Sequence, residues 1–135
     1  MESSEDGRTW TFHIRNGVRF HDGTPMSNAD AAAGVRRIMA HPKYDPTGNY
    51  RAVESVVAKG NSELVFQLKE PVPDFPKLIA YYGSPIIKPS SYQADGRITD
   101  FIATGPYKID KVFPGDHIGL SAFDGYWGEK PAYKN

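Results

Sequence analysis

The sequence predicts an α+β fold in which β hairpins, antiparallel or in a mixed sheet, combine with two or three helices. Several short segments alternate apolar and polar residues, which is the periodicity of a half-buried strand. One alanine-rich segment repeats its apolar residues at helical spacing instead. The 135 residues include 11 prolines and 13 glycines, which divide the chain into short elements joined by fixed turns. A chain of this length is expected to form about one domain.

The first predicted hairpin begins with a strand at residues 8–15. Every second residue is apolar and either aromatic or β-branched, so one face of this strand is expected to be buried. These residues are Trp10, Phe12 and Ile14. Asn16-Gly17 follows, a pair that favours a tight turn because both residues tolerate a positive φ. Residues 18–20 are therefore predicted to return as a short second strand.

A helix is predicted over residues 28–40. Ser27 is a favourable N-cap, and Asp30 three residues later gives an arrangement close to a capping box, with Asp in place of Glu. The apolar residues that follow share one helical stripe. Arg36 and Arg37 lie near the C-terminal end, where the helix dipole favours cations.

The rest of the chain alternates between strand patterns and proline-bounded turns, with a loop at residues 41–49. The expected elements, in chain order, are a hairpin over 52–69 that turns at Gly60-Asn61, a short helix starting near Asp74, one helical turn at 89–92, and a hairpin with strands at 107–112 and 117–123.

The composition excludes several functions. Sixteen acidic and 16 basic side chains leave no net charge, which argues against bulk attraction to nucleic acid or anionic lipid. The absence of cysteine excludes disulfides, thiolate metal sites and cysteine nucleophiles. The 4 histidines lack the helical spacing of metal ligands, and no glycine-rich phosphate loop occurs, so no cofactor is expected. The acidic start is unlike a secretory leader, which indicates either a cytoplasmic protein or an exported chain without its first residues.

Two segments are candidates for a binding site. Tyr81, Tyr82, Gly83 and Ser84 place two rings and a small hydroxyl group between a helix and an apolar run, and small-molecule clefts use aromatic walls with a few polar tips. Thr104 lies in a stretch whose glycine and proline fix a sharp backbone course. Packing of amphipathic rings in the core explains the same residues, so both interpretations stay open at this point.

Three motifs together resemble the family 5 extracellular solute-binding proteins. The first is Trp-Thr-Phe-His-Ile-Arg-Asn-Gly-Val-Arg-Phe-His-Asp-Gly-Thr-Pro at residues 10–25, followed by a helix. The second, at residues 103–109, is similar to the family's Gly-Thr-Gly-Pro-Tyr stretch, with Ala103 in place of the usual glycine. Pro-Gly-Asp at 114–116 and Tyr-Trp-Gly-Glu-Lys-Pro at 126–131 complete the pattern in the same order.

The resemblance implies a binding component of a bacterial ABC importer for peptides or a related solute, such as a nickel chelate, rather than an enzyme. Family members are much longer and have two lobes around a cleft. Residues 1–135 are therefore expected to be a single excised part of lobe I, with strands returning from about residue 103 and the second lobe absent. The implied location is the periplasm or cell surface, and the implied partners are the solute and the membrane permease. A lipid anchor would lie outside this chain.

The same resemblance implies that residues 81–84 and Thr104 contact the ligand in the intact protein. It leaves the ligand open among peptides, nickel chelates, opines and sugars. One alternative is an effector-sensing domain of a transcription regulator, and another is an unrelated enzyme or interaction domain. Apolar surface left uncovered in an isolated subdomain would favour weak self-association.

Overall fold

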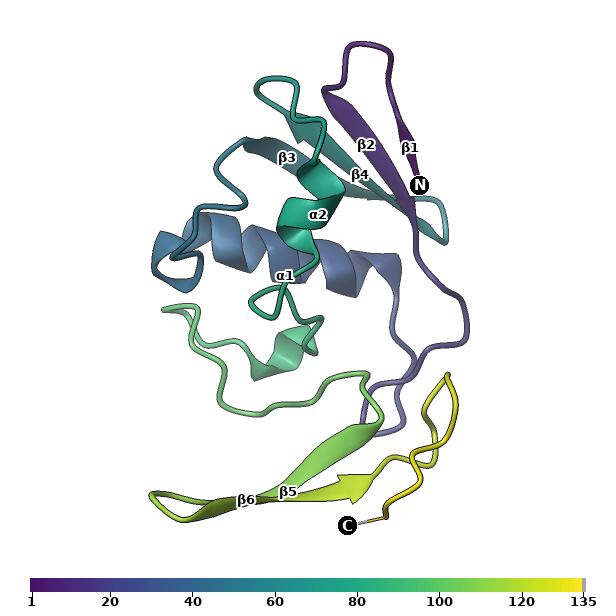
Figure 1. Ribbon diagram of the computed structural model, residues 1–135, viewed down its shortest axis with the longest axis vertical. Coiled ribbons are helices and arrows are strands. Elements are labelled where there is room, and N and C mark those ends of the chain that lie inside the picture. Colours follow the sequence, from purple (N-terminus) through teal and green to yellow (C-terminus); the bar gives the residue numbers. More distant parts are fainter. Residues whose placement is uncertain (135) are drawn as a thin grey trace.

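A computed structural model describes residues 1–134 and contains two antiparallel sheets with helices between them (Figure 1). The larger sheet has the strand order β1-β2-β4-β3, and the smaller is the hairpin β5–β6. The strands are β1 (Glu2–Ser3), β2 (Thr9–His13), β3 (Val53–Lys59), β4 (Glu63–Leu68), β5 (Tyr107–Phe113) and β6 (His117–Ala122). The helices are α1 (Asn28–Ala40) and α2 (Phe75–Ile79), with single 3₁₀ turns at Pro42–Tyr44 and Pro89–Ser91. The predicted α+β class is confirmed.

Helix α1 occupies the residues that its sequence pattern predicts. The Ser27 side chain accepts from the Asp30 backbone N–H, and the Asp30 carboxylate accepts from the Ser27 N–H at 2.8 Å, which completes the capping box. The buried face packs on β3 and β4 and carries Ala31, Ala32, Val35 and Ile38. Asn28, also buried, donates to the carbonyls of Glu63 at 2.8 Å and Lys59 at 3.2 Å. This side chain therefore ties the start of α1 to the β3–β4 turn.

The core lies between α1 and the larger sheet. Phe66 of β4 and Phe75 of α2 are fully buried, and their ring centroids lie 5.1 Å apart in an edge-to-face arrangement. Phe12 of β2 packs edge-on against both rings. Offset and edge-to-face pairs of this kind add stability beyond the apolar area that they bury. Helix α2 is thereby fixed against the same core, although it has only five residues.

The first predicted hairpin is wrong. Strand β2 pairs with β4 and with β1, and residues 18–20 form only an isolated bridge between Arg19 and Pro25. Val18 and Phe20 are nevertheless buried, so the alternation correctly indicated burial but not a partner strand. The physical reason is that β4 offers β2 a five-residue ladder that includes the pairs Trp10–Phe66 and Phe12–Leu64, a longer pairing than three residues after the turn could supply.

The other predicted elements are confirmed. The hairpin over 52–69 is β3–β4, and the last predicted hairpin is β5–β6. The short helix and the helical turn occur at α2 and Pro89–Ser91. Strand β1 was not expected, because its polar residues carry no strand pattern; it pairs Ser3 with Trp10. None of the helices in residues 1–134 has the length and apolar character needed to cross a membrane.

The β5–β6 hairpin lies at the opposite end of the molecule from the larger sheet (Figure 1). Within residues 1–134, β5 and β6 pack on each other and on no other helix or strand. Large apolar side chains of the hairpin are exposed: Ile109, Val112, Phe113, Ile118 and Leu120. An apolar hairpin without a covering layer is expected to need a partner surface.

Candidate functional site

Two adjoining hollows open beside the core and share the side chains of Ile14 and Ile86. The first has a volume of about 170 Å³ and lies between α1, the larger sheet and the segment after α2. Its remaining lining is mostly apolar and consists of Phe12, Ala31, Val35, Tyr50, Leu64, Phe66, Ile79 and Ser84. Apolar walls with few polar groups are typical of a site that binds the apolar part of a small molecule.

The polar groups of the first hollow come from two loops. The Tyr50 hydroxyl donates to Ser84 Oγ at 2.8 Å, and burial raises the pKa of Tyr50, which keeps this donor protonated. Asp45 beneath them is buried, and its carboxylate accepts from the backbone N–H groups of Asn49 and Tyr50 at 2.9 Å each. Asp45 therefore orders the loop that carries Tyr50.

The two adjacent tyrosines differ in their surroundings. Tyr81 is half-buried, its hydroxyl lies 3.5 Å from Asp45 Oδ1, and burial raises its pKa. Tyr82 is 92% exposed and makes an edge-to-face contact with Tyr81 at a centroid distance of 5.5 Å. Gly83 follows closely under the Tyr81 ring, where an added Cβ would collide with ring atoms. Tyr82 thus projects into solvent instead of packing in the core.

The second hollow has a volume of about 240 Å³ and is walled by His13, Val18, Met26, Thr104, Arg15 and Trp127, together with the shared isoleucines. The Arg15 guanidinium carbon lies 4.6 Å from the centroid of the Trp127 ring, a cation–π contact. Thr104, from the chain segment before β5, supplies a hydroxyl group to the lining of the same hollow. Charge and hydrogen-bonding capacity therefore sit at this end of the site.

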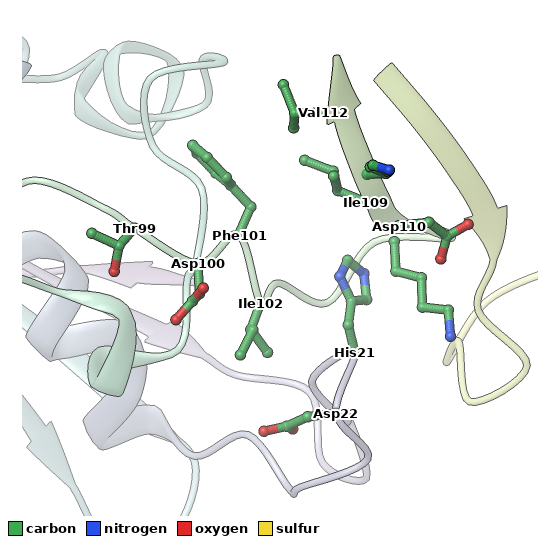
Figure 2. A pocket seen from close by; sticks show the side chains of 11 residues that line it. His21, Asp22, Thr99, Asp100, Phe101, Ile102, Ile109, Asp110 and Val112 are labelled. Carbon is green, nitrogen blue, oxygen red and sulfur yellow. The ribbon is translucent and has the colours of Figure 1, made fainter. Parts of the chain in front are cut away.

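A third and larger hollow of about 400 Å³ lies between the turn after Phe20, the 99–102 segment and β5 (Figure 2). His21 rises between these segments, and its Nε2 lies 3.0 Å from the Gly105 carbonyl oxygen. Asp22 forms an ion pair with Lys88, and this hydrogen bond, with that from Thr24, lowers the pKa of Asp22 to about 2. These groups bind other parts of the chain, so this hollow marks a junction between segments rather than the favoured site.

The structure brings together only some of the residues that the sequence indicated. Ser84 and Thr104 line the adjoining hollows, whereas Tyr81, Tyr82 and Gly83 line neither of them. Tyr50, Arg15 and Trp127 were not among the candidates. Tyr50 lies in a loop without periodicity, so no local signal indicates it. No group of three or more His, Asp or Glu side chains within residues 1–134 could hold a metal ion.

Comparison with known proteins identifies the family. The model of the bacterial extracellular solute-binding proteins, family 5 (middle region), matches residues 1–135. The chain belongs to this family. Within the family it is 28% identical to the glutathione-binding protein GsiB of Escherichia coli over 127 residues, which are 92% of this chain and 25% of GsiB. It is 33% identical to protein XP55 of Streptomyces lividans over 139 aligned positions, with 98% of this chain and 25% of XP55 covered.

The solved structures agree with this assignment. NikA from Brucella suis, crystallised with Fe(III)-EDTA, is 30% identical and superposes with a TM-score of 0.85 over 98% of this chain and 28% of NikA. This chain therefore spans about a quarter of the length of the relatives that it matches. The resemblance based on the three sequence motifs is confirmed. The family is defined by binding of extracellular solutes, which indirectly supports a protein that binds rather than catalyses.

Proposed function

We propose that this chain forms one wall of the solute cleft in a bacterial extracellular solute-binding protein that delivers a peptide or related solute to an ABC importer. The observation that carries the proposal is the match of residues 1–135 to the family, together with the close superposition on NikA. The names of the relatives support a small-solute or peptide ligand, since GsiB is a glutathione-binding protein and NikA was crystallised with a metal chelate.

The proposed contact residues are Tyr81, Tyr82, Gly83, Ser84 and Thr104. Their geometry supports this role because Ser84 and Thr104 line adjoining hollows, and Tyr82, two positions before Ser84 in the sequence, is exposed to solvent. Gly83 permits the close approach of the Tyr81 ring, which in turn supports Tyr82. Tyr82 would stack on the solute, and Ser84, which already accepts from Tyr50, retains a hydroxyl proton to donate to it.

In the parent protein, residues 1–135 would be one unit of the first lobe, and a second lobe would close over the solute. Closure selects a solute because only a fitting one contacts both walls in the closed state. The closed form would then dock on a membrane permease, in the periplasm or at the cell surface. The exposed β5–β6 hairpin supports this arrangement, since its apolar side chains would pack on the rest of the parent.

Binding of defined solutes to the protein encoded by the whole open reading frame tests this function. Glutathione, trialanine and a nickel–histidine chelate would be titrated by calorimetry against the parent and its Tyr82→Ala variant. We expect saturable binding of at least one probe and a loss of roughly tenfold in affinity in the variant, because an exposed ring that stacks on a ligand contributes about 1 kcal/mol or more.

The matched control is Tyr133→Ala, which removes a ring that is 77% exposed and lies outside both hollows. The control should bind the probe as the parent does. Equal affinity of all three proteins would contradict the proposed role of residues 81–84, and the absence of binding to any of the three probes would contradict the proposed solute class.

A further inference from the structure

We infer that the second hollow is a subsite for a carboxylate attached to an apolar body, with Arg15 and Thr104 as its recognition groups and Trp127 as a positioning residue. The inference deepens the proposed function, because it names the chemical class of solute at one end of the same site.

The hollow itself is shaped for an apolar group. Ile14, Val18, Met26 and Ile86 are its apolar lining residues, and about 240 Å³ is enough for a short alkyl chain or a small ring. Val18 is buried, and the two isoleucines are half-buried in the adjoining core, so these walls belong to the packed part of the molecule. A solute that fills this hollow would bury apolar surface without rearranging the fold.

Arg15 brings a positive charge to the rim of this apolar hollow without an internal counter-ion. No carboxylate within residues 1–134 lies close enough to the Arg15 guanidinium to form an ion pair. Nearby, His13 Nε2 lies 3.5 Å from Glu2 Oε1, and that pair is highly exposed to solvent. The Arg15 guanidinium therefore keeps its planar edge free for an incoming carboxylate, which is the geometry that arginine recognises by two parallel hydrogen bonds.

Trp127 holds this cation in position. The guanidinium is 4.6 Å from the indole centroid, and stacking of this kind leaves the N–H donors at the edge of the guanidinium plane unoccupied. Trp127 comes from the chain segment after β6, more than a hundred residues from Arg15 in sequence, so the contact is formed only in the folded protein. Thr104, which also lines this hollow, adds a hydroxyl donor for the carboxylate or for a neighbouring amide of the solute.

The test uses this chain itself and three simple probes. Hexanoate, hexanamide and hexylammonium have the same apolar chain and differ in the head group. Each would be titrated into the isotopically labelled chain, and binding would be followed by the chemical shifts of the Trp127 indole N–H, the Thr104 amide and the Arg15 side chain. We expect hexanoate to bind with the highest affinity, hexanamide to bind more weakly, and hexylammonium to bind most weakly.

Arg15→Gln should lower the affinity for hexanoate about fivefold, since a charge-assisted contact at an exposed side chain contributes up to about 1 kcal/mol. The affinity for hexanamide should change less than about twofold, because the amide gains little from the charge. Thr104→Val should weaken hexanoate binding without altering the shape of the hollow. Arg8→Gln is the matched control: Arg8 is also exposed and lies at the opposite end of β2, so it should leave the preference unchanged.

Equal binding of hexanoate and hexanamide would overturn the inference, as would no binding of hexanoate or an Arg15→Gln variant that keeps the preference. The spectra also report whether each variant is folded. Because the probes are simple acids and the measurement uses only residues 1–135, the result is independent of peptide binding by the parent. If the parent binds none of the calorimetry probes but this chain prefers hexanoate, the proposed function is rejected and the subsite is kept. If the parent binds a probe but this chain shows no preference for hexanoate, the subsite is rejected and the proposed function is kept.

Discussion

Trp10 combines a ring that packs against the core with an indole N–H that lacks a hydrogen-bond partner among residues 1–134. It lies on β2 and packs against the core, yet its indole Nε1 is buried without a hydrogen-bond partner among residues 1–134. A buried N–H without a partner costs free energy, whereas the ring contributes apolar burial. The two effects oppose each other at a single position, and two substitutions can separate them.

Trp10→Ala should lower the free energy of unfolding by about 3 kcal/mol, the lower end for a buried tryptophan, because the side chain is only partly buried. Trp10→Phe should cost less than about 1.5 kcal/mol, since it keeps a ring and removes the unpaired N–H. Urea unfolding of the three proteins measures both values. An unchanged stability of Trp10→Ala would refute the packing role of this residue.

The Asp22–Lys88 ion pair makes the free energy of unfolding depend on pH at acidic values. The hydrogen bond from Lys88, followed by that from Thr24, lowers the pKa of Asp22 from 3.8 to about 2. A carboxyl group with a lowered pKa in the folded state stabilises the protein above its unfolded pKa and loses this effect as pH falls toward the folded value. Both side chains are partly exposed, so the contribution should stay below about 1 kcal/mol.

Comparison of the unsubstituted chain with its Asp22→Asn variant over a range of pH tests this dependence. The unsubstituted chain should be more stable by a constant amount at pH values well above 3.8, and the stability difference should shrink between pH 3.8 and about 2. Asp124→Asn, at an exposed position without an ion pair to any of residues 1–134, serves as the control. A stability difference that is the same at about pH 6 and at about pH 2 would contradict the assigned ion pair.

At the scale of the element, the sequence was most informative where one segment contains its own signals. Helix α1 follows from the capping pair Ser27 and Asp30 and from one apolar stripe, and the β3–β4 hairpin follows from two alternating segments joined by a turn. The partner of β2 could not be predicted, because alternation indicates a buried face and not which strand lies beside it. Likewise, Tyr50 joins Ser84 only through tertiary contact across 34 positions.

The capping box of α1 provides an element-scale prediction. Ser27→Ala removes the acceptor for the Asp30 N–H and should lower the free energy of unfolding by about 1 kcal/mol. Ser90→Ala, an exposed serine in a 3₁₀ turn without a capping hydrogen bond, should change it by less than about 0.5 kcal/mol. Thermal unfolding of both variants measures the effects, and equal costs would show that the cap contributes nothing specific.

The β5–β6 hairpin provides a second prediction at the scale of the element. Because it packs on no other helix or strand of residues 1–134 and exposes several apolar side chains, it should be the least protected sheet of the isolated chain. Backbone amides of β5 and β6 should exchange with solvent faster than those of β3 and β4. Replacing both Ile118 and Leu120 by Thr should also reduce concentration-dependent association in sedimentation experiments. Equal protection of the two sheets would show that the hairpin is already covered.

At the scale of the whole molecule, two hollows adjoin each other beside the core and share Ile14 and Ile86. The sequence motifs identified the family and two of the residues that line these hollows, Ser84 and Thr104. They could not indicate that Ile14 and Ile86 line both hollows, because these two residues come together only after folding. The chain spans about a quarter of its relatives, and in the proposed function an opposing wall from the parent would complete the cleft.

Titration calorimetry of the parent protein and of residues 1–135 side by side is the most direct test of this account, with glutathione, trialanine and the nickel–histidine chelate as probes. The account predicts that the parent binds at least one of them saturably, whereas the isolated chain binds the same probe at least a hundredfold more weakly, because one wall alone lacks the contacts of the closed cleft (about 2.7 kcal/mol). Tight binding of that probe by residues 1–135 alone would contradict it.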